Sequence, residues 1–256
     1  MRDICGIVRR IVIFSIILVG VVAGLSFGWR RPQARPTRTV PSAAEEGGAA
    51  RSAGILRLDS LVSARKHTLR RIAESSTYLS AMLIQSDSVL KRWSDRLANP
   101  LLVYLPPGAA RDYTPEMGDA ARSAFDRWER VAGIPVTFTF TRDSARADVL
   151  VRWIDNFPIE RTGQADVKWN GAGWLLSGTL TLATHNPGGV TLPPEAVYTV
   201  ALHEIGHLLG LGHSDDPADV MYPTTDVRVD ITSRDRQTAR LLYDLPPGSV
   251  RIPAAQ

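Results

Sequence analysis

The stretch HEIGHLLGLGH, residues 203–213, holds three of the five histidines of this 256-residue chain. His203 and His207 are four residues apart, so on a helix both imidazoles project from one face, one turn apart. Gly210 can adopt a positive φ, which would end that helix and turn the chain back. The reversal would bring His213 beside the other two rings as a third nitrogen donor.

This spacing predicts a catalytic metal site. Three protein nitrogens leave the fourth position of a tetrahedral zinc ion free for water, which is the arrangement of catalytic rather than structural sites. Glu204 lies beside His203 and can lean toward the open side of the metal, where a carboxylate can accept a proton. A competing interpretation is a metal site that has lost its activity, and the presence of Glu204 argues against it.

A methionine follows the third histidine by eight residues, in Asp219-Val220-Met221-Tyr222-Pro223. A buried Met221 beneath the histidines would give the metal site an apolar floor. The Met-Tyr-Pro sequence alone is weak evidence, and its spacing from the histidines makes it informative.

The run H-E-x-x-H-x-x-G-x-x-H with a downstream methionine resembles the metzincin zinc peptidases. Three further segments resemble their matrixin branch: His213-Ser214, Asp216-Pro217 and Met221-Tyr222-Pro223. The resemblance covers residues 100–245, and only residues 203–223 carry the specific motif. It implies a twisted mixed sheet over two long helices, with the active-site cleft between an upper and a lower subdomain.

By this resemblance the three histidines are zinc ligands, Glu204 is the general base and Met221 is a structural residue. The implied reaction is hydrolysis of peptide bonds by a metal-activated water, with Glu204 passing the proton to the leaving amine. The substrate would lie extended along an edge strand within Gly163–Asn170. Pro223 stands where astacin-like and serralysin-like members carry a tyrosine, so no tyrosine ligand is assigned.

The chain also departs from the matrixin pattern. Its single cysteine, Cys5, precedes the apolar segment, so the pro-segment cysteine that blocks zinc in many secreted matrixins is absent. Those relatives hold a second, structural zinc with histidines and an aspartate, whereas His185 is the one histidine between residues 155 and 195. We therefore predict one catalytic zinc ion. Carbonyls and carboxylates around Asp155–Gly189 could bind calcium, although no motif in the sequence supports a calcium site.

Hydrophobic periodicity and turn residues predict an α+β (α/β sandwich) domain over residues 100–256. The expected elements are strands at Leu101–Leu105, Val136–Phe140, Ala147–Trp153, Asp166–Trp169 and Gly178–Thr184, and helices from Thr114 to Val131, from Pro194 to Leu211 and from Thr232 onward.

An uncharged apolar run covers residues 11–29. A helix there would span about 28 Å, close to the hydrocarbon thickness of a bilayer. The run exceeds the apolar core of a signal peptide, which favours an uncleaved transmembrane signal anchor over a cleaved signal peptide and a secreted protein. Arginines flank both ends, so the orientation stays open, and we expect a single-pass protein with an extracytoplasmic catalytic domain.

The remaining N-terminal parts are a basic flank at 1–10, a Pro- and Arg-rich linker at 30–54 and a helical segment at 55–99. In the helical segment apolar residues recur every seven residues, with Ser75-Ser76-Thr77 as a natural break. Two alternatives stay open. The segment is a coiled-coil stalk or helical pro-segment, which would allow self-association, or it is one or two amphipathic helices packed on the body.

The net charge of +4 lies entirely in residues 1–50, which contain seven arginines and three acidic residues. The remainder of the chain is neutral, which gives little reason to expect nucleic acid as a partner. Expected partners are therefore a protein or peptide substrate and a membrane. The alternative function is a membrane-tethered binding protein with a vestigial zinc site, which the presence of Glu204 and Gly210 disfavours.

Overall fold

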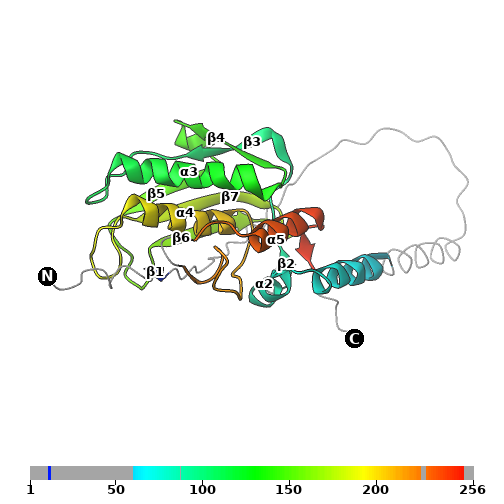
Figure 1. Ribbon diagram of the computed structural model, residues 1–256. Coiled ribbons are helices and arrows are strands. Elements are labelled where there is room, and N and C mark those ends of the chain that lie inside the picture. Colours follow the sequence, from blue (N-terminus) through cyan, green and yellow to red (C-terminus); the bar gives the residue numbers. More distant parts are fainter. Residues whose placement is uncertain (1–10, 13–59, 87, 226–228, 251–256) are drawn as a thin grey trace, which may run out of the picture.

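The computed structural model describes residues 11–12, 60–86, 88–225 and 229–250. A five-stranded sheet carries helices α3 (Pro115–Ala132) and α4 (Pro194–Leu208) on one face, as Figure 1 shows. The helix α5 (Ser233–Asp244) lies beside one end of this pair. The expectation of a mixed α/β domain with long helices on a sheet is confirmed.

The strand order in the sheet is β4-β3-β5-β7-β6. Four strands run parallel, and β6 pairs antiparallel with β7 at one edge of the sheet. Their bounds are β3 Arg96–Tyr104, β4 Val136–Thr141, β5 Val149–Ile154, β6 Gly163–Trp169 and β7 Leu175–Ala183. The strand that was expected to form an edge within residues 163–170 does so.

Alternating apolar residues bind the sheet to the helices. In β7, Leu180 and Leu182 are buried against the helical layer, whereas Thr179 and Thr181 point to the opposite face. Trp128 on α3 is fully buried, and its indole N–H donates to a backbone carbonyl of α4 at 2.8 Å. The two long helices and the sheet therefore share one core.

The ends of the elements follow local signals. Helix α5 begins after Thr232, which forms a capping box with Asp235. Helix α4 ends at Leu208, three residues before the expected end, because Gly210 adopts a φ of +96° and turns the chain. A short 3₁₀ turn, η1 (Ser144–Arg146), precedes β5.

The segment before residue 100 is helical only in part. Residues 60–73 are helical, the chain bends at Ser75–Thr77, and α2 spans Leu79–Gln85. Leu79, Met82 and Leu83 are buried, so α2 packs on the body, as the second of the two alternatives proposed.

The expected helix does not continue after α2. Ser88 has a φ of +60°, and β2 (Val89–Leu90) pairs with β9 (Gly248–Ser249). Trp93 is completely buried, and β3 begins before the expected domain start at residue 100. Leu90 and Trp93 keep the seven-residue spacing and are buried without a helix, whereas Leu97, the next residue of the repeat, is exposed.

The predicted membrane segment falls almost wholly outside the described residues, as do the basic flank and the linker. Its first two residues form β1 (Ile11–Val12), paired with β8 (Thr224–Thr225). Within the part of the chain that is described, no helix combines the length and the apolar character that crossing a membrane requires.

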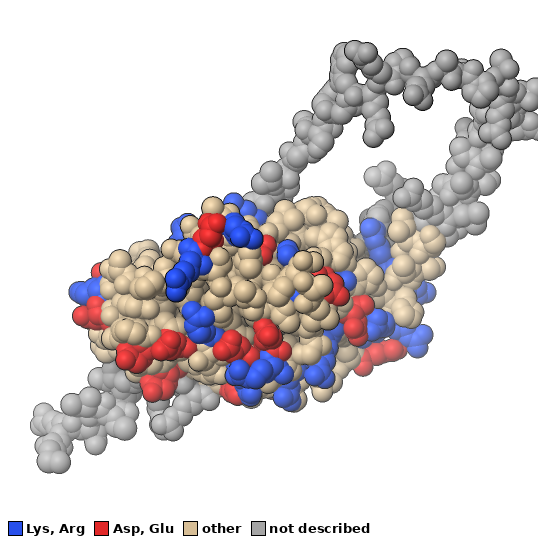
Figure 2. All heavy atoms as spheres, turned by 90° about the horizontal axis from the view of Figure 1, so that it is seen from above, with Lys and Arg blue, Asp and Glu red and all other residues tan. Residues whose placement is uncertain are grey.

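Charged side chains of both signs are interspersed over the face of the body shown in Figure 2. This distribution agrees with the neutral charge of residues 51–256. That face therefore offers no broad field of one sign such as nucleic-acid binding uses.

Candidate metal centre

Three histidines meet at the end of α4. His203 and His207 lie one turn apart on the helix, and His213 comes from the loop that follows. One nitrogen from each ring lies within 4.8 Å of the other two, and the Nε2 atoms of His203 and His207 are 3.1 Å apart. The structure thus brings together all three residues that the sequence predicted as ligands.

Backbone carbonyls orient two of the rings. The Nδ1 atom of His203 lies 2.7 Å from the carbonyl oxygen of Val220, and Nδ1 of His207 lies 2.8 Å from that of Leu211. When Nδ1–H donates to a carbonyl, the Nε2 atom keeps its lone pair for a metal. Both tautomers are therefore fixed for ligation through Nε2.

The third ring carries an unsatisfied atom. Nε2 of His213 is buried and has no hydrogen-bond partner. A buried polar atom without a partner costs about 1–3 kcal/mol, so it calls for an explanation. A zinc ion shared with the other two rings would satisfy it, and three imidazole nitrogens are an established zinc donor set. The residues present fit the expected ion.

Burial keeps these imidazoles neutral. Desolvation, with the nearby His213 as a lesser cause, lowers the pKa of His203 to about 3. Burial lowers the pKa of His213 to about 4. The pKa of His207 also lies well below its ordinary value, through burial first and the neighbouring rings second. Neutral imidazole is the form that binds a metal, so the site needs no deprotonation near pH 7.

Gly210 makes the chain reversal to the third histidine feasible. Its φ of +96° lies in the region that favours glycine, and a Cβ there would lie 2.1 Å from the carbonyl oxygen of Lys91. The turn lets Leu211 present its carbonyl to His207 and carries the chain back to His213. The interpretation of Gly210 as the residue that ends the helix is thus supported by its backbone.

Met221 forms the floor beneath the helix that carries the ligands. It is fully buried, and its sulfur lies 2.2 Å from where a Cβ on Gly206 would be. Its carbonyl accepts a hydrogen bond from the Ser214 amide at 2.9 Å. The turn that contains Met221 therefore contacts both α4 and Ser214, the residue after the third predicted ligand.

A polar network anchors the same turn to α5. The buried carboxylate of Asp219 accepts hydrogen bonds from Ser214, Thr232 and Arg234. The guanidinium of Arg234 also pairs with Asp215. These residues fix the loop between the third histidine and Met221 without contributing a metal ligand.

Glu204 is fully buried and lies where α4 faces the edge strand. A Cβ on Gly163 of β6 would lie 2.7 Å from Cγ of Glu204 and 3.0 Å from its Oε1. The absence of a side chain at Gly163 therefore lets strand and helix approach around this carboxylate. The sequence motif identified Glu204, but it gave no signal for Gly163.

His185 stands apart from the three-histidine cluster. It is buried, with Nε2 3.0 Å from a carboxylate oxygen of Asp112 and Nδ1 2.9 Å from the hydroxyl of Thr184. Its two ring nitrogens are thus both engaged with protein groups.

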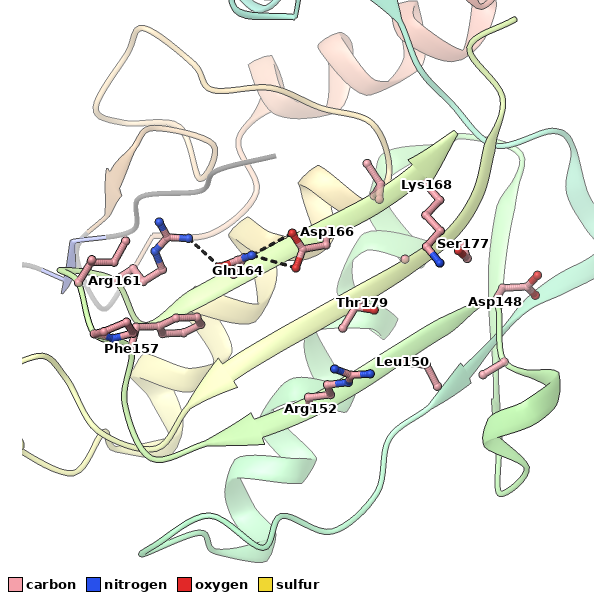
Figure 3. A pocket seen from close by; sticks show the side chains of 15 residues that line it. Asp148, Leu150, Arg152, Phe157, Arg161, Gln164, Asp166, Lys168, Ser177 and Thr179 are labelled. Atoms are coloured by element: carbon pink, nitrogen blue, oxygen red, sulfur yellow. Dashed lines mark hydrogen bonds between the residues drawn. The ribbon is translucent and has the colours of Figure 1, made fainter. Parts of the chain in front are cut away.

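A hollow of about 630 Å³ lies on the sheet face opposite the helices (Figure 3). Figure 3 shows Gln164 between Arg161 and Asp166; its side chain accepts from Arg161 at 2.7 Å and donates to both carboxylate oxygens of Asp166 at 2.9 Å. Neither the three histidines nor Glu204 or Met221 lines it, whereas Gln164, Asp166, Val167 and Lys168 of the expected substrate strand do.

Fold and site define an α/β domain with a three-histidine metal centre of the catalytic type. The family model for matrixin matches residues 109–244, more than half of the chain. The chain therefore belongs to the matrixin family, as its motif predicted.

Its relatives include plant and animal proteins. It is 33% identical to Metalloendoproteinase 1-MMP of Arabidopsis thaliana over 138 residues, which cover 49% of this chain and 37% of the relative. It is 28% identical to Metalloendoproteinase 1 of Glycine max over 159 residues, 52% of this chain and 48% of the relative. The interstitial collagenase of Equus caballus is 28% identical over 148 residues, 54% of this chain and 30% of the relative. The chain thus spans less than half the length of each of these relatives.

Proposed function

We propose that this protein is a zinc-dependent endopeptidase that acts on protein or peptide substrates. The convergence of three histidine nitrogens, one of them buried without a partner, carries this proposal. Membership of the matrixin family and similarity to proteins named metalloendoproteinases support it.

A zinc ion at the three histidines supplies Lewis acidity toward a carbonyl oxygen and lowers the pKa of a water. Glu204 then acts as general base, because its carboxylate follows His203 directly on the helix and is buried beside the edge strand. It takes the proton of the attacking water and delivers it to the leaving amine. The contact with β6 restricts the carboxylate to this location.

The edge strand β6 is the proposed site for the substrate backbone. It ends the five-stranded sheet and runs antiparallel to its neighbour, with Gly163 next to Glu204. An extended peptide can add to such an edge through main-chain hydrogen bonds. A peptide bond bound along β6 would thereby lie near the carboxylate.

A peptide-library digestion tests the proposed activity. The full chain loaded with zinc is expected to produce internal cleavages that mass spectrometry detects, to lose this activity with a chelator and to regain it with zinc. The matched control is His213→Ala, which lacks one ligand and should stay inactive at stoichiometric zinc. Absence of cleavage by the zinc-loaded wild type would favour a binding protein with a vestigial site.

We also propose that residues 11–29 anchor the protein in a membrane as a single span, with the catalytic domain on the extracytoplasmic side. This arrangement requires that Ile11 and Val12 leave their pairing with β8. The uncharged apolar run and its flanking arginines support this proposal. The full chain should remain in the membrane fraction after carbonate extraction, and external protease should degrade its catalytic domain in intact cells. A variant lacking residues 11–29 should be extracted, and extraction of the full chain would contradict the anchor.

A further inference from the structure

The helix α2 precedes the residues that match the matrixin family model, yet it contacts the loop that carries the third histidine. Cγ of Met82 occupies the space beside Gly212, 2.4 Å from where a Cβ on that glycine would be. The side-chain oxygen of Gln85 accepts a hydrogen bond from the backbone amide of His213 at 3.3 Å. Two successive residues of the ligand loop are thus held by one helix.

The residue before α2 reaches a second ligand through α5. The buried hydroxyl of Tyr78 donates to Asp235 at 3.1 Å. The other carboxylate oxygen of Asp235 accepts from the Val220 amide at 3.0 Å, and the Val220 carbonyl contacts Nδ1 of His203 at 2.7 Å. A chain of hydrogen bonds therefore joins Tyr78 to His203.

The segment after α2 contacts the C-terminal end of α4, the helix that carries His203 and His207. The indole N–H of Trp93 donates to the carbonyl oxygen of Leu208 at 2.8 Å. The carbonyl oxygen of Lys91 lies against the α-carbon of Gly210, at the reversal of the chain. Residues within 78–86 and 88–93 therefore contact the chain on both sides of the turn that leads to His213.

We propose that residues 78–86 and 88–93 form a permanent positioning element of the metal centre, in which Met82 and Gln85 hold His213 in place for zinc. The first two ligands are placed by one helix, whereas the third depends on the conformation of a loop. A partner that fixes a ligand typically changes metal affinity 10-fold to 100-fold. The element is therefore no removable pro-segment, and a processing cut that preserves the zinc site must fall before Tyr78.

Zinc affinity of the full chain tests this inference independently of the proposed peptidase activity. Gln85→Leu removes the acceptor for the His213 amide, whereas Gln85→Glu keeps one. Ile84→Ala is the matched control, because Ile84 lies on the same helix with 86% of its surface exposed. Each dissociation constant is measured by chelator competition, well below the melting temperature of the zinc-free variant. The absorption spectrum of the cobalt-substituted protein reports the ligand geometry.

We expect Gln85→Leu and Met82→Ala to weaken zinc binding about tenfold and to shift the cobalt spectrum. Gln85→Glu and Ile84→Ala should match the wild type. The inference is overturned if the zinc affinities of Gln85→Leu and Met82→Ala both stay within twofold of the wild type, or if Ile84→Ala loses as much affinity as they do. If Met82→Ala fails to fold, the comparison of the two Gln85 variants decides. A wild-type chain that binds no zinc would instead refute the proposed function.

Discussion

Single residues set the geometry of the metal centre through their backbones as much as through their side chains. The carbonyls of Val220 and Leu211 orient two imidazoles, and the left-handed turn at Gly210 places the third. A sequence motif shows the donors, but it cannot show which carbonyl each ring contacts. Gly210 is the position where this backbone dependence can be measured.

Gly210→Ala should lower the free energy of unfolding by about 3 kcal/mol. An alanine there meets both the left-handed strain and the carbonyl oxygen of Lys91. Gly189→Ala is the matched control, since its φ is +76° but its Cβ would meet nothing within 4 Å. Gly189→Ala should lower the free energy of unfolding by only about 1 kcal/mol, because it introduces the left-handed strain alone. Chemical denaturation measures both, and equal losses would contradict the close approach at Gly210.

At the scale of elements, the proposed catalytic carboxylate depends on how closely α4 approaches β6. Gly163 provides this approach, because a Cβ would collide with Glu204 and with Val200 of the same helix. The approach exists only after two elements distant in the sequence have packed together. The motif therefore could not indicate it.

Gly163→Ala should reduce kcat of peptide hydrolysis by roughly 10-fold to 100-fold while zinc content stays at one ion per chain. The reason is that the added methyl group displaces the Glu204 carboxylate and leaves the histidines in place. In the control Gly178→Ala, on the next strand, the Cβ would meet the end of the flexible Leu208 side chain. Full activity of Gly163→Ala would show that this contact does not position Glu204.

The sequence predicted the elements of the matrixin domain better than those of the segment before it. Strands and helices after residue 100 have clear periodicity, and their positions agree within a few residues with the structure. The helical expectation for 55–99 is wrong after Gln85, because Leu90 and Trp93 keep the apolar spacing while the chain turns. The contact between Tyr78 and Asp235 joins residues 157 positions apart, which no local pattern can reveal.

At the scale of the whole molecule, the metal centre joins parts of the chain that are far apart in sequence. Its predicted ligands lie on α4 and the following loop, Met221 packs against α4 at Gly206, and support for the ligand loop comes from α2 and Trp93. A fragment that begins at residue 100 would lack this support. Measurements on the zinc site therefore require the full chain.

Zinc should stabilise the folded molecule as a whole. At free zinc about 100 times its dissociation constant, binding to the folded state alone adds about 2.7 kcal/mol. For a chain of this size we expect the melting temperature to rise by about 5–10 °C. Calorimetry with and without zinc measures the shift. His213→Ala should show almost none at the same concentration, and a full shift in that variant would place the ion elsewhere.

The role of Glu204 is tested most directly by comparing peptide hydrolysis by the wild type and by Glu204→Gln at equal, measured zinc occupancy. The glutamine keeps the shape of the side chain but cannot accept the proton of the attacking water. We expect both proteins to hold one zinc ion and kcat/KM of the variant to fall by about 10²-fold to 10⁴-fold. A zinc-loaded variant that cleaves within tenfold of the wild-type rate would contradict the role of Glu204 as general base.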